Sequence, residues 1–394
     1  MSSHSPKQLE KLRAWWWHRQ GLDATTQFTS AAAVLKQSGW ARSVGGCAPY
    51  LTLFSRGAIS REQADEAVAS LEIHELPSAR ACTYVLPAED YSLGLHLAQN
   101  SPSGDMRAAE KLGVTQKEVD KLCQAVLTAL KSGPLTPDDI RQATGNAVRS
   151  LGPEGQKKGI SSTLPLALGQ LQKSGHIRRI STNGRLDNQR YQYALWQPNL
   201  LTKKKLAPER AEAELAKLFF QWIAPARLSD FQAFAGISAK AAKKAVQALN
   251  LEPLSKEDDL LLPPSLRAAF ESFTPPKDPS YHLVISIDSL LLLRRDLQTL
   301  LDPATLKHPL LSGMLMELPS PAIVDRGRVV GLWEYDPATE SIAYATFGKK
   351  DALLKKAVAK TEEYVRTQLG DARTFSLDSP KSRMPRIEAL RKAE

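Results

Sequence analysis

The sequence predicts an α+β fold, on the basis of three features of its hydrophobic pattern. Short amphipathic helices are followed by pairs of short strands, and this order occurs three times in the first two thirds of the chain. The last third is richer in strands. The repeat lies in the order of the elements and not in residue identity. With 394 residues, 42% of them hydrophobic, the chain is long enough for about two to four domains.

The second unit, residues 105–202, shows the pattern most clearly. Apolar residues recur with the 3.6-residue period of a helix, which Gly133 ends. Thr136 is a candidate cap for a second helix, and Ser161 or Ser162 for a third. The helices are expected over 117–133, 136–145 and 160–175, and two alternating strands over 176–181 and 190–196. Three helices followed by a hairpin with a long basic loop is the order of a winged helix.

In a winged helix the third helix enters the major groove of DNA, and the hairpin loop, called the wing, lies against the backbone or the minor groove. Arginines lie in or beside the predicted wing: Arg178, Arg179, Arg185 and Arg190. A guanidinium group suits phosphate through its charge and its paired donors, so these residues are predicted to contact DNA. The alternative is a solvated hairpin whose arginines bind nothing specific.

The third unit (203–276) and the first (1–104) repeat this order. In the third unit, helices are predicted over 208–224, 227–236 and 238–250, and strands over 251–254 and 259–263. Its last helix carries Lys240, Lys243 and Lys244, which are further candidates for phosphate contact. In the first unit, helices are predicted over 6–20, 30–39, 48–57, 60–71 and 87–100, and strands over 73–76 and 81–87.

The last unit (277–394) is predicted to be a small β-rich domain that ends in a helix. Residues 281–297, 321–336 and 341–348 read as β-rich, and the last two resemble a hairpin joined at 337–340. A helix over 351–370 closes on Gly370. Linkers rich in Pro, Ser, Gly or charge are expected at 101–105, 202–209 and 273–280. Tandem winged-helix domains followed by this domain are the predicted architecture.

The net charge of +10 makes a polyanion the first partner to consider. A basic module for a membrane surface is the alternative. No stretch approaches eighteen consecutive apolar residues, and the N-terminus lacks the pattern of an export signal. We therefore expect a cytoplasmic protein, nucleoid-associated when bound to DNA.

The sequence lacks the motifs that are typical of cofactor enzymes and metal sites. Cys47, Cys82 and Cys123 lack a zinc-site spacing and are predicted to be reduced, structural thiols. The histidines show no metal-binding pair, and no phosphate loop, nucleophile elbow or dinucleotide fingerprint occurs. The sequence predicts neither a metal nor a cofactor.

Four stretches, in this order, resemble a known family: SVGGCAPYLTLFSRG, ELPSARACTYVLPAEDYSL, VDRGRVVGLWEYDP and QLGDARTFSLDSPKSR. The chain is similar to the AlkZ-like (YcaQ-type) winged-helix DNA glycosylases. The resemblance covers most of the chain. It implies tandem winged helices in a concave DNA-binding shape with a β-rich C-terminal domain, and an activity that unhooks alkylated bases and interstrand crosslinks without a metal or nucleotide cofactor.

The hallmark of that family is a Gln-apolar-Gln motif that positions the attacking water. The equivalent stretch reads Cys47-Ala48-Pro49, and no glutamine lies between Gln37 and Gln63. A thiol and a proline cannot orient water as two amides do. The resemblance therefore implies a divergent member that keeps DNA binding and has lost or altered base excision. Arg56 resembles the family's arginine on this helix and is predicted to be structural or phosphate-binding.

Hydrolysis of a glycosidic bond in DNA requires an extruded base and a polar group that positions water. Asp90 and Glu89 are candidates by chemistry alone, although their place after a proline at a helix start favours capping. The carboxylates Glu334 and Asp336 flank a predicted turn, which favours a local role.

Two aromatic or histidine-containing stretches have a structural alternative that we prefer. His74 and Glu75 lie beside a predicted strand, where a hydrogen-bonded local histidine is expected. Trp15, Trp16 and Trp17 point in different directions on one helix, so two of them are expected in the core. The third, with His18 or Arg19, is a candidate for contact with a flipped base or the DNA backbone.

The leading interpretation is a monomeric, DNA-damage-associated protein that binds double-stranded DNA, damaged or not. The second is an active DNA glycosylase with a non-standard pocket that uses Asp90 or Glu89. The third is a winged-helix transcriptional regulator. Steep salt dependence would separate all three from a protein-interaction scaffold, and preference for a lesion would separate repair from regulation.

Overall fold

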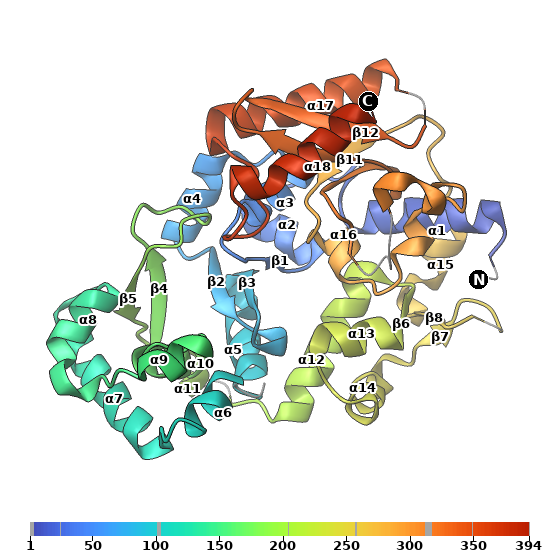
Figure 1. Ribbon diagram of the computed structural model, residues 1–394. Helices are drawn as coiled ribbons and strands as arrows, with labels where there is room; N and C mark the ends of the chain where they lie inside the picture. Colours follow the sequence, from blue (N-terminus) through green and yellow to red (C-terminus); the bar gives the residue numbers. More distant parts are fainter. Residues whose placement is uncertain are drawn as a thin grey trace.

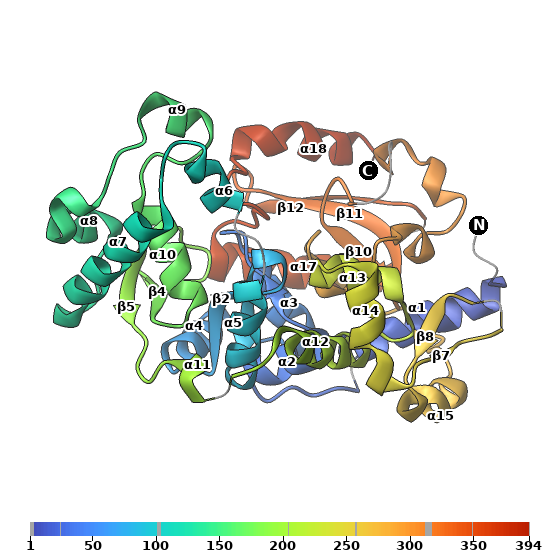
Figure 2. The same ribbon diagram turned by 90° about the horizontal axis from the view of Figure 1, so that it is seen from below.

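The computed structural model describes residues 4–23, 25–100, 104–203, 205–256, 258–311, 317–348 and 350–393. Figure 1 shows the strand-rich C-terminal region at the top, a helix-rich unit with β4 and β5 at the lower left, and α12 to α15 at the lower right. Seen from below, the molecule is elongated, with α7 and α8 at one end and α15 at the other (Figure 2). The predicted linker at 101–105 lies mostly outside the described residues.

The N-terminal region contains every helix and strand predicted for it. Its elements are α1 (Pro6–Arg19), α2 (Ala31–Ser38), β1 (Ala41–Arg42), α3 (Ala48–Gly57), α4 (Arg61–Ala69), β2 (Ile73–Pro77), β3 (Thr83–Pro87) and α5 (Tyr91–Asn100). The three strands form an antiparallel sheet in the order β1-β3-β2. The strand β1 was not predicted, because two residues are too few to show an alternating pattern.

The second unit contains the three predicted helices and two predicted strands in order. Its elements are α6 (Gly104–Glu110), α7 (Gln116–Ala129), α8 (Pro137–Thr144), α9 (Gly152–Lys157), α10 (Leu164–Lys173), β4 (Ile177–Ser181), β5 (Tyr191–Leu195) and α11 (Leu200–Lys203). The helices α6, α9 and α11 were not predicted. Thr136 caps α8 as predicted, in a capping box with Asp139. The cap predicted for the third helix was wrong, because α10 begins after Thr163, whose side chain makes no capping hydrogen bond.

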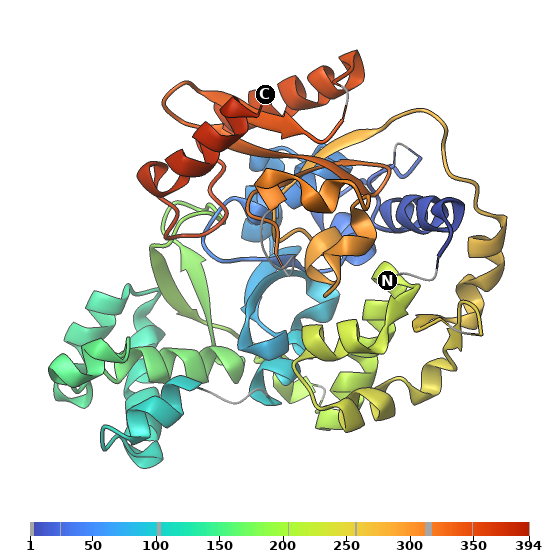
Figure 3. The same ribbon diagram turned by 45° about the vertical axis from the view of Figure 1, so that its right-hand side comes forward.

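The third unit repeats the order in a smaller form. Its elements are α12 (Pro208–Ile223), β6 (Ala226–Arg227), α13 (Leu228–Ala235), α14 (Ala239–Ala245), β7 (Glu252–Pro253), β8 (Leu260–Leu262) and α15 (Pro264–Ser272). The strands pair in the order β6-β8-β7. Gly236 ends α13 in the left-handed conformation that glycine adopts without strain. In Figure 3 the light-blue β2, β3 and α5 lie between this unit and the second one, and α5 contacts both α10 and α12.

The C-terminal region is built on one antiparallel sheet in the order β12-β11-β10-β9. Its elements are β9 (Tyr281–Val284), α16 (Ser289–Leu292), β10 (Ala322–Asp325), β11 (Arg328–Asp336), β12 (Ser341–Thr346), α17 (Ala352–Tyr364) and α18 (Pro380–Lys392). The predicted hairpin is confirmed, since Asp336 pairs with Ser341 across its turn. A π-helical turn continues α17 to Gly370.

One expectation for the C-terminal region was wrong, and one helix was not predicted. The β-rich reading of 281–297 holds only as far as Val284, because Asp288 caps a short helix and turns the apolar run that follows away from the sheet. Short apolar runs do not distinguish strand from helix by their period. The helix α18 was not predicted, since Pro385 lies inside it.

The hydrophobic cores join segments that are distant in sequence. The second unit has a cluster of its own, which includes Val126 of α7 and Leu171 of α10. Another cluster combines residues from the N-terminal, third and C-terminal regions, among them Trp16, Trp222 and Leu332. These three regions therefore pack as one body, and the second unit packs beside it.

Candidate nucleic-acid interface

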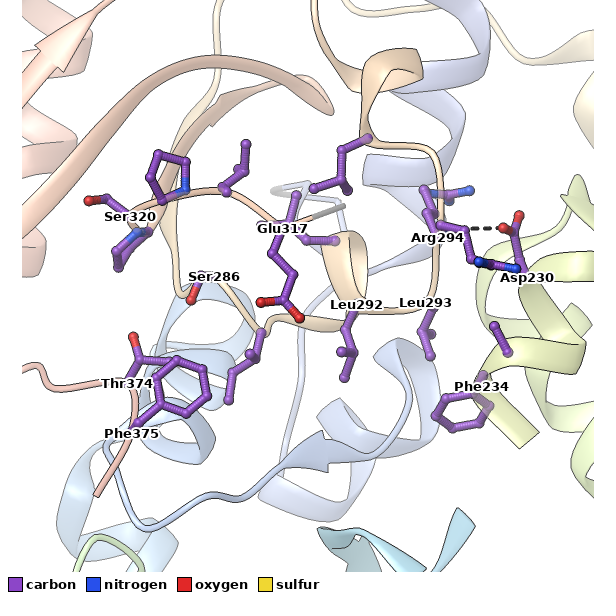
Figure 4. Close-up of a pocket in the computed structure, with 18 of the residues that line it drawn as sticks. Asp230, Phe234, Ser286, Leu292, Leu293, Arg294, Glu317, Ser320, Thr374 and Phe375 are labelled. Atoms are coloured by element: carbon purple, nitrogen blue, oxygen red, sulfur yellow. Dashed lines mark hydrogen bonds between the residues drawn. The ribbon is translucent and has the colours of Figure 1, made fainter. Parts of the chain in front are cut away.

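A cavity of about 520 Å³ lies where the N-terminal, third and C-terminal regions meet. Its wall includes Tyr84 of β3, Phe234 of α13, the loop 286–297, the residues 317–321 and the segment 374–375. Figure 4 shows Phe234, Ser286, Leu292, Ser320 and Phe375 around a common space. The volume falls in the range of small-ligand pockets, which is roughly 300–1,000 Å³.

One arginine reaches this cavity from a strained turn. Arg80 and Ala81 form the tip of the β2–β3 hairpin, and both have positive φ angles, of 60° and 55°. Such angles cost free energy in residues other than glycine, and strained turns cluster at functional sites. The Arg80 side chain packs on Gly236, where an added Cβ would lie 2.5 Å from its Cγ. Within the described chain its guanidinium makes no hydrogen bond or ion pair.

Two of the cavity carboxylates are engaged by the protein itself. Asp230 accepts hydrogen bonds from the backbone N–H groups of Arg295 at 3.0 Å and Arg227 at 3.3 Å. Glu334 accepts from Nε of Arg386 at 2.7 Å and from the Ser320 hydroxyl at 3.0 Å. Burial raises the pKa of both carboxyl groups, against the opposing effect of these donors. Both groups therefore hold the walls of the cavity together.

Glu317 differs from these carboxylates. Its side chain points into the middle of the cavity in Figure 4, and it is exposed. Among the described residues, no donor hydrogen-bonds its carboxylate. It is thus a cavity carboxylate with free acceptor capacity.

The stretch Cys47-Ala48-Pro49 lies at the start of α3 and does not line this cavity. Cys47 is buried, and both its backbone N–H and its Sγ approach the carbonyl oxygen of Arg373, at 3.0 and 3.2 Å. Burial raises the pKa of the thiol. A Cβ on Gly46 would lie 2.2 Å from the Thr374 carbonyl oxygen, so the C-terminal segment covers this position closely. Cys47 is therefore a packed, protonated thiol.

The carboxylates chosen by sequence lie away from the cavity. Asp90 accepts a hydrogen bond of 2.8 Å from the indole N–H of Trp40, and burial raises its pKa. Glu89 pairs with Lys36 at 2.6 Å on the surface. The structure thus uses Asp90 to anchor a core tryptophan and does not bring it to Cys47 or to the cavity.

Two of the predicted wing arginines are held by protein partners. Arg179 forms an ion pair of 2.8 Å with Glu75 and lies over the Tyr191 ring. Arg185 pairs with Asp187 and donates to the backbone carbonyl of Leu369 at 3.1 Å. The hairpin loop 182–190 is therefore docked on the body of the protein.

The docking of this loop involves the N-terminal region as well. The Tyr50 hydroxyl donates to Asp65 and accepts from the backbone N–H of Leu186 at 2.8 Å. Arg373 donates to the carbonyl of Asp187 at 3.2 Å. These contacts connect the loop to α3, α4 and the segment after α17.

The other basic candidates differ in how far they are exposed. Arg56 is buried and binds both carboxylate oxygens of Asp288 at 2.7 Å, so its structural alternative is the one supported by the contacts. Arg178 is half-buried, and desolvation lowers its pKa. The remaining candidates, Arg190, Lys240, Lys243 and Lys244, are exposed and make no ion pair with any described residue.

All three tryptophans of α1 are buried, so the expected base-stacking tryptophan is a wrong prediction. The indole N–H groups of Trp15 and Trp16 donate to the carbonyls of Ala224 and Pro225. The C-terminal region and α12 pack against different sides of α1, so tryptophans that point in different directions are all buried. Arg19 donates to the Gln221 carbonyl. His18 forms a contact of 2.5 Å with Asp23.

His74 is buried, and the expectation of a hydrogen-bonded histidine was wrong, because neither of its ring nitrogens has a hydrogen-bond partner among the described residues. Its ring packs edge-on against Trp196 at 5.2 Å, where β2 meets the second unit. Glu75 holds Arg179, as described above. Asp336 accepts from the Ala338 N–H in the turn, which agrees with a local role, and it also pairs with Arg391 of α18 at 2.7 Å. The local role expected of Glu334 was wrong, because its carboxylate binds Arg386 of α18.

Sequence reasoning missed Arg80 and Glu317 as cavity residues. Arg80 lies between two predicted strands whose connection has neither glycine nor asparagine, and this unusual turn was the available signal. Nothing in the sequence pattern marks Glu317. The described residues contain no group of three or more potential metal ligands and no helix long and apolar enough to span a membrane.

Comparisons with known proteins identify the family of this chain. No curated protein sequence matches the chain. Among solved structures, the Streptomyces sahachiroi DNA glycosylase AlkZ has the same fold, with a TM-score of 0.68 and 21% sequence identity over 93% of this chain and 98% of that one. The family model of AlkZ-like DNA glycosylases matches residues 29–373. The chain therefore belongs to the AlkZ-like DNA glycosylase family.

Proposed function

We propose that this protein binds double-stranded DNA, as part of DNA repair, across the face that holds the central cavity. The observation that carries this proposal is the unpaired guanidinium of Arg80, held on a strained turn in the cavity wall of a member of a DNA glycosylase family. A strained backbone with a free cation is retained most readily when a ligand uses it. The net charge of +10 favours a polyanion.

In this proposal the second and third units are winged helices with different tasks. The third unit contacts phosphates through Lys240, Lys243 and Lys244 on α14, which are exposed and free of ion pairs within the described chain. The helix α13, which precedes α14, lines the cavity, so DNA bound along α14 passes its mouth. The hairpin of the second unit supplies Arg190 and Arg178, because Arg179 and Arg185 already have partners. The protein acts as a monomer.

The test is the salt dependence of duplex binding, measured by fluorescence anisotropy. Replacing Lys243 and Lys244 with Ala removes two phosphate contacts and is expected to reduce the slope of log affinity against log salt by about 2. The matched control replaces Lys355 and Lys356 of α17, a second adjacent pair of exposed lysines, and leaves the slope unchanged. Equal slopes for the two variants would contradict the assignment of α14.

The second candidate function is hydrolysis of the glycosidic bond of an alkylated base. The position of Glu317 favours it, because a carboxylate aimed into the cavity can orient a water toward a flipped nucleotide. In this proposal Glu317, from a different part of the chain, takes the place of the Gln-apolar-Gln motif that the resemblance leads one to expect at residues 47–49.

The assay for excision counts abasic sites in a duplex that carries an N7-alkylguanine. Release by the wild type and by Asp90→Asn, but not by Glu317→Gln, supports an enzyme that uses Glu317. Release that Asp90→Asn abolishes would instead restore the assignment made from sequence. Binding without release by the wild type leaves a DNA-binding protein that has lost excision.

A further inference from the structure

Exposed large apolar side chains are rare on this protein, and two of them lie together. Among the described residues they are Leu353, Phe375 and Leu377, with exposed fractions of 51%, 41% and 91%. Phe375 and Leu377 belong to the short segment between Gly370 and α18. Exposed apolar groups that lie together mark a surface that contacts another molecule.

This segment has a fixed backbone. The N–H of Ser376 donates to the Val44 carbonyl at 3.0 Å. Asp378 closes a turn, because its carboxylate accepts from the Phe375 N–H at 3.0 Å and its own N–H donates back to the Phe375 carbonyl at 3.0 Å. The turn presents the two side chains in a preformed arrangement, so little conformational entropy is lost when they bind.

The segment lies at the wall of the central cavity. Figure 4 shows Thr374 and Phe375 at one side of the space into which Glu317 points. Arg80 lines the same cavity, and Lys381, three residues after the turn, is exposed. Apolar side chains flanked by free cations match the chemistry of a DNA duplex, whose stacked bases are apolar and whose backbone is anionic.

We propose that Phe375 and Leu377 form an apolar wedge that inserts between stacked bases of the bound duplex. Proteins that insert Phe or Leu in this way unstack a base step and kink the DNA. Phe375, at the cavity wall, stacks on the base next to the opened step, while the cavity takes up the displaced nucleotide. This inference rests on the proposed function.

The experiment uses a duplex with 2-aminopurine, whose fluorescence rises when it leaves the base stack. The wild-type protein is expected to raise the fluorescence on binding. The double variant Phe375→Ser/Leu377→Ser is expected to lose this rise and to bind about fivefold to one hundredfold more weakly, as expected for lost stacking on a base. Its salt slope stays the same because no charge changes.

The matched control is Leu353→Ser, which removes the other exposed large apolar side chain and lies on α17. It is expected to bind and unstack DNA like the wild type. Because both wedge residues are exposed, circular dichroism and the Tm of the double variant are expected to match the wild type, and Phe375→Trp to retain the fluorescence rise.

The contrary outcomes are distinct from one another. If the wild type binds DNA with a steep salt slope but without a fluorescence rise, or if the double variant binds equally well, the wedge is overturned and the proposed function stands. If the wild type binds no duplex at low salt, both fail. If light scattering shows a dimer that the double variant abolishes, the pair is a contact between two copies of this chain and the wedge is overturned.

Discussion

The second and third units share one order of helices and strands, yet they present their cations in opposite ways. In the second unit the hairpin loop 182–190 is docked on the rest of the protein. Arg179 and Arg185 form ion pairs with protein carboxylates. In the third unit Lys243 and Lys244 of α14 are exposed and form no ion pair with the residues that the structure describes. A basic residue in a predicted DNA-binding element is therefore available for DNA only where the rest of the fold leaves it unpaired.

The largest expected effect tests whether docking of the hairpin stabilises the protein. Replacing Arg179 with Met leaves the buried Glu75 without its cation and is expected to lower the free energy of unfolding by about 3 kcal/mol. Urea denaturation measures this change. The control Arg178→Met removes the neighbouring arginine, which has no ion-pair partner among the described residues, and changes the free energy of unfolding by less than about 1 kcal/mol. Equal losses would mean that the Glu75 pair is not what holds the hairpin.

A second prediction is that acid lowers the stability of the contact between β2 and the second unit, where His74 packs on Trp196. Burial, together with Arg178 and Arg179, lowers the pKa of His74 to about 3 from its ordinary 6.5. Between pH 6.5 and pH 3, His74 is protonated in the unfolded chain but neutral in the folded protein. The free energy of unfolding therefore decreases as the pH falls from 6.5 toward 3. Between pH 7 and pH 5 the loss is expected to be about 2 kcal/mol.

The variant His74→Phe keeps a ring against Trp196 and removes the titration. Urea denaturation at the two pH values should therefore show a stability loss smaller by about 2 kcal/mol for the variant. A variant with the same acid sensitivity as the wild type would assign the effect to other groups.

A smaller effect is expected at the tip of the docked loop. Tyr50→Phe removes the hydroxyl that joins Asp65 to the Leu186 N–H, at a cost of about 1.5 kcal/mol. The loop then opens more often, and trypsin cuts at Arg185 or Arg190 faster. Tyr281→Phe is the control, because that hydroxyl binds Asp351 in the C-terminal region. Faster loop cleavage in both variants would show global loosening.

The smallest effect separates the two units by DNA binding. Lys243→Ala is expected to lower the salt slope by about 0.9, the value for one phosphate contact. Arg185→Ala is expected to leave the slope unchanged, because its guanidinium already binds Asp187 and the Leu369 carbonyl. A lower slope for Arg185→Ala would show that the loop leaves the body when DNA binds.

The apolar pattern was sufficient for most elements and failed where a cap or a proline departs from it. The helices α7, α8 and α12 follow from apolar period and caps, and the β11–β12 hairpin follows from alternation and its turn. The region after Val284 and α18 did not follow, because an Asp288 cap and an internal proline override the pattern.

The candidate site was less predictable than the fold. Asp90 was chosen by chemistry, but its environment is set by Trp40, fifty positions away. Cys47 was placed correctly beside the first turn of α3, while the C-terminal segment that covers it lies more than three hundred positions further on. Arg80 and Glu317 come together only when three regions pack around one cavity.

By itself the sequence determined the mixed helix and strand composition, the positive charge and the resemblance to a family, because period, caps and charge are local or additive properties. The tertiary structure alone decided which cations remain free, which carboxylates face the cavity and which apolar side chains stay exposed. These depend on pairings between residues far apart in the chain, and a guanidinium that meets a buried carboxylate is no longer available to a phosphate.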